Sequence, residues 1–294
     1  MAATFHAYDP KPRFGADYAA LRDFLIRLDN LNYHFGRWDW MITHGYLDES
    51  ALDRIGLWTD GGAVVAAAVY DCVPGKAFLL ALPGYENLRE EMLGYAQTAL
   101  AKDGKFAVLI PDVDEALRRI AARRGFTATR DTEHEAVFDL ENGDFSYTLP
   151  DGFHITSMKE TYDLYKYGQV LWKGFDHERN GEGAFVMNGH CKTEFERPNV
   201  NLDIKIAVVA PNGDFVSYCG MWQDKASPTA LVEPVATDPA YRRLGLGRAA
   251  VLEGLRRCAL LGAKRAVVGS SQQFYHGIGF TPYSSNSYWE AMVK

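Results

Sequence analysis

The sequence has no long hydrophobic run. Its longest apolar stretches, such as Ala63 to Tyr70, are far shorter than the roughly 20 residues that cross a bilayer. The first residues, MAATFHAYDPKPRF, lack the apolar region of a secretory signal. We therefore expect a soluble, cytoplasmic protein without a membrane partner.

Cysteine is scarce and carries no metal-site spacing. Cys72, Cys191, Cys219 and Cys258 are widely separated, and no two of them form a CxxC pair. His190 stands beside Cys191, but no further ligand follows at the spacing that a zinc site needs. We expect no metal and a reducing, cytoplasmic environment.

The sequence also lacks an excess of basic charge. It has 31 Lys and Arg against 38 Asp and Glu, which gives a formal net charge of -7. That charge would repel a polyanion unless the basic residues gathered on one face, so we expect no nucleic-acid partner. With 47% hydrophobic and 13% aromatic residues the chain is globular, and 294 residues favour two domains.

The two halves of the chain repeat one order of predicted strands. Turn residues separate β-rich runs at Asp60-Gly61-Gly62 and Val73-Pro74-Gly75, and again at Pro211-Asn212-Gly213 and Ala226-Ser227-Pro228. Each set predicts three successive antiparallel strands. Gly62 and Gly213 are 151 positions apart, which is the first sign of a duplication.

The elements that follow keep nearly the same offset. Each half predicts a helix and then a short strand: Asn87 to Ala101 with Lys105 to Ile110, and Gly245 to Leu261 with Arg265 to Gly269. A second short helix ends at Gly125-Phe126 and at Gly279-Phe280, and the two phenylalanines are 154 positions apart. Because the offset is sustained, we expect an α/β protein of two similar domains, each a mixed, mostly antiparallel sheet flanked by helices.

A polar connection divides the halves. ENGDFSYTLPDG, from Glu141 to Gly152, is rich in turn residues. The expected division is therefore residues 1–141, a linker over 142–152, and residues 153–294. Each half begins with a predicted helix, Asp17 to Leu31 or Lys159 to Trp172, followed by an aromatic region, FGRWDW or WKGFDHERNGEGAF, that we expect to form an irregular substrate wall.

The segment most informative about chemistry is VEPVATDPAYRRLGLGR, from Val232 to Arg248. Glycines before a helix allow backbone N–H groups to converge on an anion, and the helix N-terminus adds about half a positive charge. A Walker loop would require Gly-Lys-Ser/Thr, which is missing. Gly245, Gly247 and Ala250 fit a loose dinucleotide spacing, but no acidic residue follows about 20 positions later.

Two motifs together resemble the GNAT superfamily of acyl-CoA-dependent N-acetyltransferases. Arg242, Gly245 and Gly247 fill the family signature Arg/Gln-x-x-Gly-x-Gly/Ala, and Tyr275-x-x-x-Gly279-Phe280 matches its closing Tyr-x-x-x-Gly-Phe. The resemblance covers residues 152–294 with both motifs. It extends to the first half only through the order of strands and helices, and there the equivalent loop falls near Glu90 to Tyr95, where two carboxylates would repel a pyrophosphate.

The resemblance implies acetyl-CoA as the acyl donor and assigns backbone roles to this chain. Amides from Arg243 to Arg248 would hold the pyrophosphate, and the backbone from Val235 to Thr237 would pair with the pantetheine arm. The residues expected to bind the cofactor are Val235, Ala236, Thr237, Arg242, Arg243, Leu244, Gly245, Leu246, Gly247 and Arg248. The N-terminal domain would be a degenerate partner without a cofactor loop.

Acyl transfer to an amine requires a base, an oxyanion donor and a proton donor for the departing thiolate. Tyr275 matches the family position whose phenol reaches the CoA sulfur, and the backbone N–H of Val235 or a neighbour is the expected oxyanion donor. Glu233 lies two residues before Val235, on the same face of a regular strand, and is the candidate base. His177 and His276 are weaker candidates.

These patterns predict an enzyme that transfers acetyl from acetyl-CoA to a primary amine of a small, cationic acceptor. An acidic loop with Asp176, Glu178 and Glu182 could attract such an amine. The alternative is a non-catalytic acyl-CoA-binding sensor or scaffold. A Fem-like aminoacyl-tRNA transferase shares the duplicated fold, but the retained pyrophosphate loop and the negative charge argue against it. The chain would be a monomer or a homodimer.

Overall fold

The computed structural model describes residues 3–187 and 195–292, and His190 and Cys191 lie outside them. The chain divides into two compact units. The N-terminal unit contains residues 1–42, 46–135 and 283–294, and the C-terminal unit contains residues 43–45 and 136–282. Within the described ranges, no helix is both long and apolar enough to cross a membrane.

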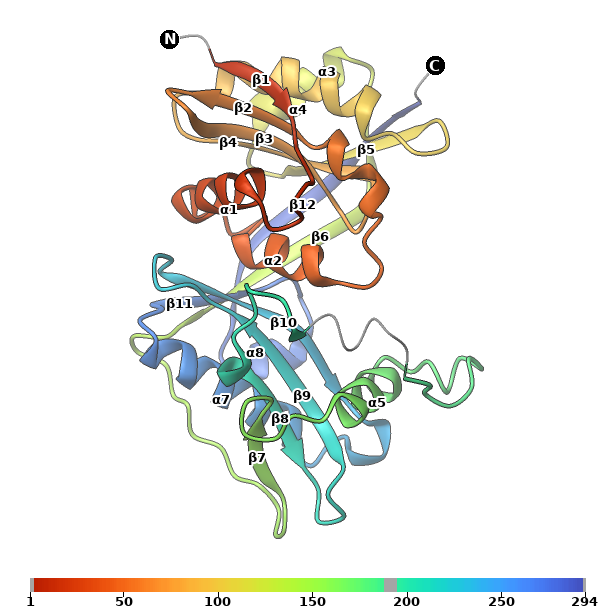
Figure 1. Cartoon of the computed structure of the whole chain (residues 1–294), viewed down its shortest axis with the longest axis vertical. Coiled ribbons are helices and arrows are strands. Elements are labelled where there is room, and N and C mark those ends of the chain that lie inside the picture. The colour runs from red at the N-terminus through yellow and green to blue at the C-terminus, as the bar shows by residue number, and fades with distance from the viewer. Residues whose placement is uncertain (1–2, 188–194, 293–294) are drawn as a thin grey trace. The chain divides into compact units, whose positions relative to one another are not determined.

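The sheet of the N-terminal unit has the order β1-β2-β3-β4-β5-β12-β6 (Figure 1). Its strands are β1 (Thr4–Ala7), β2 (Gly56–Asp60), β3 (Ala63–Asp71), β4 (Val73–Ala81), β5 (Lys105–Pro111), β6 (Thr127–Asp139, which continues into the C-terminal unit) and β12 (Thr281–Met292). β4 and β5 are parallel, whereas β1 to β4 pair antiparallel in sequence. The strand next to β5 thus comes from the far end of the sequence.

Helices accompany this sheet. They are α1 (Ala16–Leu28), α2 (Phe35–Thr43), α3 (Arg89–Ala99) and α4 (Glu115–Arg123), with 3-10 turns η1 (Glu49–Arg54) and η2 (Glu86–Leu88). Leu21, Phe24 and Leu25 of α1 and Met92, Leu93 and Ala96 of α3 are buried in one core with the strands. Spacings of three and four residues place these side chains on the inner face of each helix.

The sheet of the C-terminal unit has the order β6-β11-β10-β9-β8-β7. Its further strands are β7 (His154–Ser157), β8 (Lys205–Val209), β9 (Phe215–Trp222), β10 (Thr229–Thr237) and β11 (Arg265–Val268). Only β10 and β11 form a parallel pair among the pairings described in this unit. The helical elements are α5 (Leu164–Gly174), α7 (Leu246–Leu260), α8 (Gln273–Ile278) and the 3-10 turns η3 (Leu202–Ile204) and η4 (Pro239–Tyr241).

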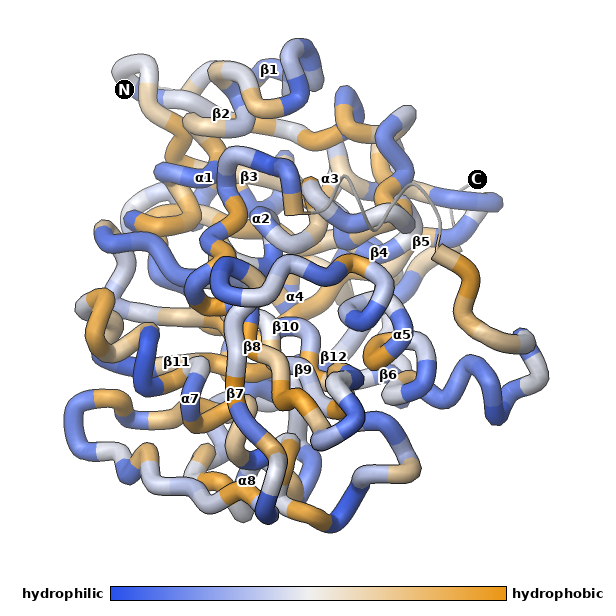
Figure 2. Tube along the Cα trace, turned by 60° about the horizontal axis from the view of Figure 1, so that its bottom comes forward, coloured by the Kyte–Doolittle hydropathy of each residue, from blue (hydrophilic) through white to orange (hydrophobic). Residues whose placement is uncertain are grey.

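Alternation along β8 separates two cores in this unit. Ile206 and Val208 pack with α7, whereas Ala207 and Val209 pack with α5. Because side chains alternate across a strand, α5 and α7 cover opposite faces of the sheet. In Figure 2 hydrophobic segments lie among β8, β9 and β10.

The mixed α/β fold, with mostly antiparallel strands flanked by helices in each unit, confirms the predicted fold class. Three of the four predicted turn sequences lie between β2 and β3, between β8 and β9, and between β9 and β10. The fourth was wrong: Val73-Pro74-Gly75 forms the start of β4, and the chain turns at Cys72, whose φ is 57°. Other expectations were also wrong or incomplete. FGRWDW is the start of the regular helix α2, the predicted helix from Lys159 begins only at Leu164, and the long strands β6 and β12 were not foreseen.

Candidate active site

The site is built where β10 and β11 separate. The two parallel strands pair only from Thr229 to Leu231 and from Arg265 to Val267. Beyond Leu231, β10 continues to Thr237 and is paired, in the described part of the chain, with β9 alone. The second half of β10 therefore offers an open edge to an extended ligand, as an added strand would need.

A bulge interrupts β10 at the start of this open edge. Val232 lies opposite Met221 and Val235 opposite Cys219, so Glu233 and Pro234 stand where the regular ladder has room for one residue. Proline has no N–H, so the first backbone donor after Glu233 is the amide of Val235. In a regular strand, the side chains of Glu233 and Val235 would lie on the same face. The bulge between Val232 and Val235 shifts the register, so this alternation no longer applies.

A tight loop follows β10 and opens α7. Arg243 and Gly245 both have positive φ, at 71° and 79°, which turns the chain sharply into the helix. Gly247 is buried, and a Cβ there would lie 3.0 Å from the Thr237 hydroxyl oxygen. A small residue at 247 thus allows the first turn of α7 to approach the end of β10.

The backbone amides of this loop are available. In the described structure, the N–H groups from Arg243 to Arg248 have no hydrogen-bond acceptor, and the first satisfied amide is that of Ala249, which donates to the Gly245 carbonyl at 3.0 Å. Residues 242–245 are exposed. Unpaired N–H groups at the positive end of a 15-residue helix form a site suited to an anion.

The three arginines around the loop have different tasks. Arg242 donates to the carbonyls of Thr237 (3.2 Å) and Gly174 (2.8 Å), and Arg248 donates to the Gly277 carbonyl at 2.8 Å. These two side chains fasten the loop to α5 and α8. Arg243 is exposed and makes no ion pair within the described residues.

Tyr275 and Glu233 lie within electrostatic reach of each other. Tyr275, on α8, is 8% exposed and packs against Phe274 and Phe280. Burial raises the pKa of the Tyr275 phenol well above its ordinary value, and the charge of Glu233 adds to this effect. The phenol therefore stays protonated at neutral pH, and it has no hydrogen-bond partner among the described residues.

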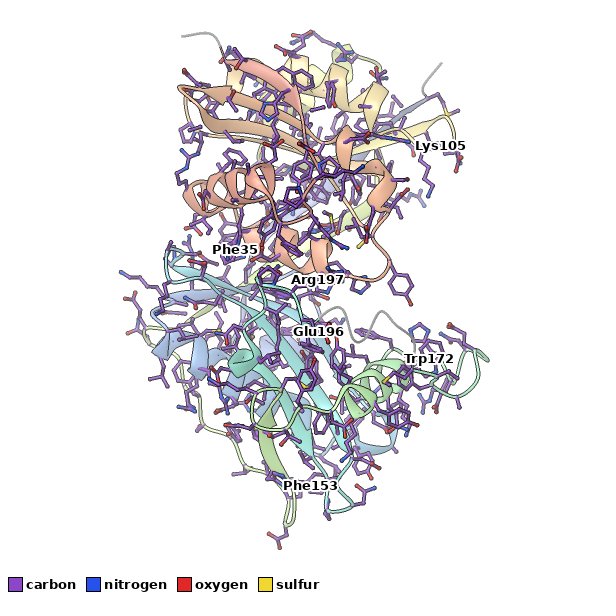
Figure 3. All side chains as sticks on the ribbon, in the orientation of Figure 1. Phe35, Lys105, Phe153, Trp172, Glu196 and Arg197 are labelled. Atoms are coloured by element: carbon purple, nitrogen blue, oxygen red, sulfur yellow. The ribbon has the colours of Figure 1, made fainter. Side chains whose placement is uncertain are left out.

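The predicted acidic loop is largely paired with itself. Asp176 forms ion pairs with Arg179 and Arg242, at 3.6 and 3.4 Å. His177 stacks on Trp172 with centroids 4.2 Å apart, and its Nδ1 lies 2.8 Å from Glu182. Figure 3 shows Trp172 on α5 beside this segment. His177 therefore has a structural role in this loop.

Two other side chains near the site have structural contacts. His276 Nδ1 lies 3.1 Å from the Phe280 carbonyl oxygen, at the end of α8. Trp222 is 3% exposed, and its indole N–H donates to the Glu233 carbonyl. No pattern in the sequence indicated this contact of Trp222.

The corresponding region of the N-terminal unit is built differently. α3 begins at Arg89, so the segment between β4 and α3 is residues 82–88, rather than the region near Glu90 to Tyr95. The Gly84 amide donates to the Glu86 carboxylate at 2.9 Å, and η2 runs directly into α3. Glu90 and Glu91 occupy the first turn of α3. Their charges oppose anion binding at this helix end.

No group of three or more His, Cys, Asp or Glu side chains that could hold a metal ion occurs among the residues that the structure describes. The cysteines there, Cys72, Cys219 and Cys258, form no disulfide. Burial raises the pKa of the Cys219 and Cys258 thiols, so neither is ionised at neutral pH. The polar groups of the site are therefore Glu233, Tyr275 and backbone amides.

Residues 169–280, which contain the end of α5, the bulge, the loop and α8, match the Acetyltransferase (GNAT) family. This region of the C-terminal unit is thus similar to GNAT acetyltransferases. None of the curated proteins matches the chain significantly.

Solved structures extend the fold comparison to the whole chain. A tandem GNAT protein from the clavulanic acid biosynthesis pathway has a TM-score of 0.62 at 14% identity, over 99% of this chain and 98% of its own. A GCN5-related N-acetyltransferase from Sphaerobacter thermophilus gives 0.60 at 13%, over 99% and 96%. A GNAT-family acetyltransferase from Colwellia psychrerythraea gives 0.58 at 9%, over 98% and 99%. The whole chain thus has a tandem GNAT fold.

Proposed function

We propose that the protein transfers an acetyl group from acetyl-CoA to the primary amine of a small acceptor, with its only cofactor site in the C-terminal unit. One observation carries the proposal: unpaired amides from Arg243 to Arg248 stand beside the open edge of β10. The match of residues 169–280 to GNAT acetyltransferases supports acyl-CoA-dependent acetyl transfer in general.

The residues present fit acetyl-CoA. The loop amides and the N-terminus of α7 suit a pyrophosphate, and the backbone of Val235, Ala236 and Thr237 suits the amide groups of a pantetheine arm. Acetyl-CoA, when bound, supplies the acetyl group as a reactive thioester. The exposed Arg243 guanidinium adds positive charge on the solvent side of the loop.

Glu233 is the proposed base. It is partly buried at the bulge, and its charge acts on the buried Tyr275. An acceptor ammonium gives one proton to the Glu233 carboxylate, and the nitrogen then attacks the acetyl carbon. A second proton leaves the nitrogen once the new N–C bond has formed, which balances the proton that the sulfur takes up as the C–S bond breaks. The Val235 N–H is the proposed donor to the acetyl oxygen.

Tyr275 is the proposed hydrogen-bond donor to the departing sulfur. An ordinary thiol has a pKa of about 8.5, whereas burial holds the pKa of Tyr275 far above that of a free phenol. Full transfer of the phenolic proton to the thiolate is therefore uphill. Tyr275 acts by donating a hydrogen bond, and solvent supplies the proton.

The remaining features of the proposal concern partners. We propose a cytoplasmic enzyme, monomeric or homodimeric, that binds neither nucleic acid nor a membrane and needs no metal. The acceptor is proposed to be a cationic amine because Glu233 is placed to meet it. The N-terminal unit is proposed to have lost cofactor binding, since Glu86, Glu90 and Glu91 surround the start of α3.

The experiment is release of CoA from acetyl-CoA in the presence of a panel of diamines, amino sugars and amino acids, with the acetylated product identified by mass spectrometry. Amine-dependent release in a one-to-one ratio with N-acetylated product supports the proposal. Tight CoA binding without transfer to any amine would instead favour a non-catalytic acyl-CoA sensor or scaffold.

A further inference from the structure

The carbonyl group of Glu233 occupies a place that only glycine leaves open. A Cβ at Gly220 would lie 2.4 Å from the Glu233 carbonyl oxygen and 3.0 Å from Cδ of Pro234. No backbone oxygen tolerates a carbon at 2.4 Å, so any larger residue at 220 displaces the bulge. Gly220 thus permits the observed direction of this peptide group.

An indole holds the same oxygen from a second side. Trp222 Nε1 donates a hydrogen bond to the Glu233 carbonyl at 2.9 Å, and the Trp222 side chain is 3% exposed. Lys205 Nζ lies 3.4 Å from the centroid of the Trp222 ring and donates to the Met221 carbonyl at 2.8 Å. A buried cation over its face fixes the indole and polarises its N–H.

These contacts place the Glu233 carbonyl on one face of the sheet. Cys219 and Met221 face the core under α7, so Gly220 between them faces the side of α5, and the Glu233 carbonyl lies there. Fixing this peptide group also fixes the direction in which the Glu233 side chain leaves the backbone.

We infer that Trp222 and Gly220 are positioning residues for Glu233: they lock the bulge of β10 in one conformation and so hold the carboxylate toward the acceptor amine. The inference rests on the proposed acetyl transfer. Trp222 does not touch the reacting atoms and acts only through the peptide group that it binds. Without its N–H, the Glu233 carbonyl loses this hydrogen bond and the peptide group is held less firmly.

The test is Trp222→Phe, which keeps an aromatic ring beside Lys205 and removes the N–H. Trp58→Phe is the matched control, because Trp58 is also buried and its Nε1 donates to Glu91 at 2.8 Å in the N-terminal unit. We expect Trp222→Phe to lower kcat about tenfold, as the loss of one hydrogen bond to a buried group allows, with unchanged acetyl-CoA affinity. The low-pH limb of its kcat profile should move, whereas Trp58→Phe should keep the wild-type profile.

A double-mutant cycle separates positioning from general damage. If Trp222 acts through Glu233, Trp222→Phe should have little further effect on kcat in a Glu233→Gln background. Wild-type kcat and pH profile in Trp222→Phe, or the same fold-loss in both backgrounds, would overturn the inference. A lower melting temperature with unchanged kcat would also overturn it, because that is the signature of a purely structural contact.

Hydrogen exchange tests the lock without any turnover. Trp222→Phe and Gly220→Ala should both speed amide exchange in the peptide covering residues 230–237, and Trp58→Phe should not. Wild-type exchange in Trp222→Phe would refute the lock even if the enzyme is active. Faster exchange in a protein that acetylates no amine would instead refute the proposed function and leave the lock standing.

Discussion

The hydroxyl of Tyr288 donates a hydrogen bond to the Glu133 carboxylate, which joins β12 to β6 within the N-terminal unit. Glu133 also accepts from Arg37 at 2.8 and 3.2 Å, and Arg37 pairs in turn with Asp71 at 2.7 Å. Burial alone would raise the pKa of Glu133, but the hydrogen bonds and charge of Arg37 outweigh it, and the pKa is lowered.

This network predicts a pH-dependent contribution to stability. A carboxyl whose folded pKa is lowered stabilises the fold above its unfolded pKa, which is near 4.5 for Glu133, and the stabilisation is lost as pH falls through the folded value. We expect Glu133→Gln to reduce the free energy of unfolding by about 1–3 kcal/mol at pH 7. The difference from wild type should shrink as pH falls below 4.5, as measured by urea denaturation.

Glu290→Gln is the control for that experiment. Glu290 lies on β12, the strand of Tyr288, and its exposed side chain makes no hydrogen bond or ion pair among the described residues. It should unfold like the wild type at both pH values. An equal loss for Glu133→Gln at pH 3 and pH 7 would contradict the assignment.

Cofactor stoichiometry follows from the loop. We expect one CoA per chain by calorimetric titration, and Gly245→Glu should weaken CoA binding at least about a hundredfold because its carboxylate faces the pyrophosphate. Gly262→Glu is the matched control: Gly262 also has positive φ and open space, but at the other end of α7. Two equivalent sites per chain, or an equal loss in both variants, would contradict the prediction.

Removing the Tyr275 hydroxyl should slow turnover and leave cofactor binding intact. Tyr275→Phe keeps the packing against Phe280, so the acetyl-CoA dissociation constant should stay within about twofold. We expect kcat to fall about 10²-fold, as for the loss of one hydrogen-bond donor to developing charge, because a thiolate is already a fair leaving group. Tyr147→Phe, which removes a hydroxyl bonded to Glu253 at 3.3 Å, should retain wild-type kcat. An unchanged kcat in Tyr275→Phe would show that the hydroxyl has no role in turnover and that Tyr275 contributes only packing.

The role of Glu233 predicts a defect that depends on pH. Glu233→Gln cannot accept a proton from an ammonium, so kcat/KM for the amine should fall about 10²- to 10⁴-fold near pH 7. The defect should diminish toward the pKa of the amine, where the acceptor arrives already neutral. Glu178→Gln, in the exposed loop, serves as the control. A pH profile that superimposes on the wild type would remove Glu233 from the mechanism.

Salt should affect acceptor binding only modestly. Residues 1–141 hold 22 acidic and 15 basic residues, whereas residues 142–294 hold 16 of each, so the net charge of -7 belongs to the first half. Asp176 and Glu182 are already paired. Raising ionic strength from about 0.05 to 0.5 M should raise KM for a diamine by about threefold or less. A preferred acceptor that is anionic would contradict the cationic assignment.

Local sequence signals predicted the elements whose geometry is fixed within a few residues. Gly61 and Gly62 both have positive φ between β2 and β3, and Gly213 does the same between β8 and β9. Only glycine adopts such angles easily, so these turns are visible in the sequence. The anion loop was visible for the same reason, since Gly245 begins α7 in a left-handed conformation.

Elements that depend on distant partners left no such signal. TPYSSNSYWEAM reads as a polar segment, and most of its side chains remain partly or fully exposed, yet it forms β12 because β5 pairs with it from Asn286 to Met292. The contacts of Gly220 and Trp222 with the Glu233 carbonyl could not be predicted from the sequence either. Gly220 and Trp222 are ordinary strand residues until β10 bulges against them.

The position of β12 also sets an order of events during synthesis. β5 has β4 on one side and needs β12 on the other, and β12 begins 170 positions after the end of β5 (281 − 111). The N-terminal unit therefore leaves the ribosome with an unpaired strand edge that persists through translation of the whole C-terminal unit. Such an edge is a template for pairing with other chains. A nascent chain arrested before residue 281 should accordingly aggregate or recruit chaperones. Synthesis of β12 covers the open edge of β5 and so removes this site for pairing with other chains.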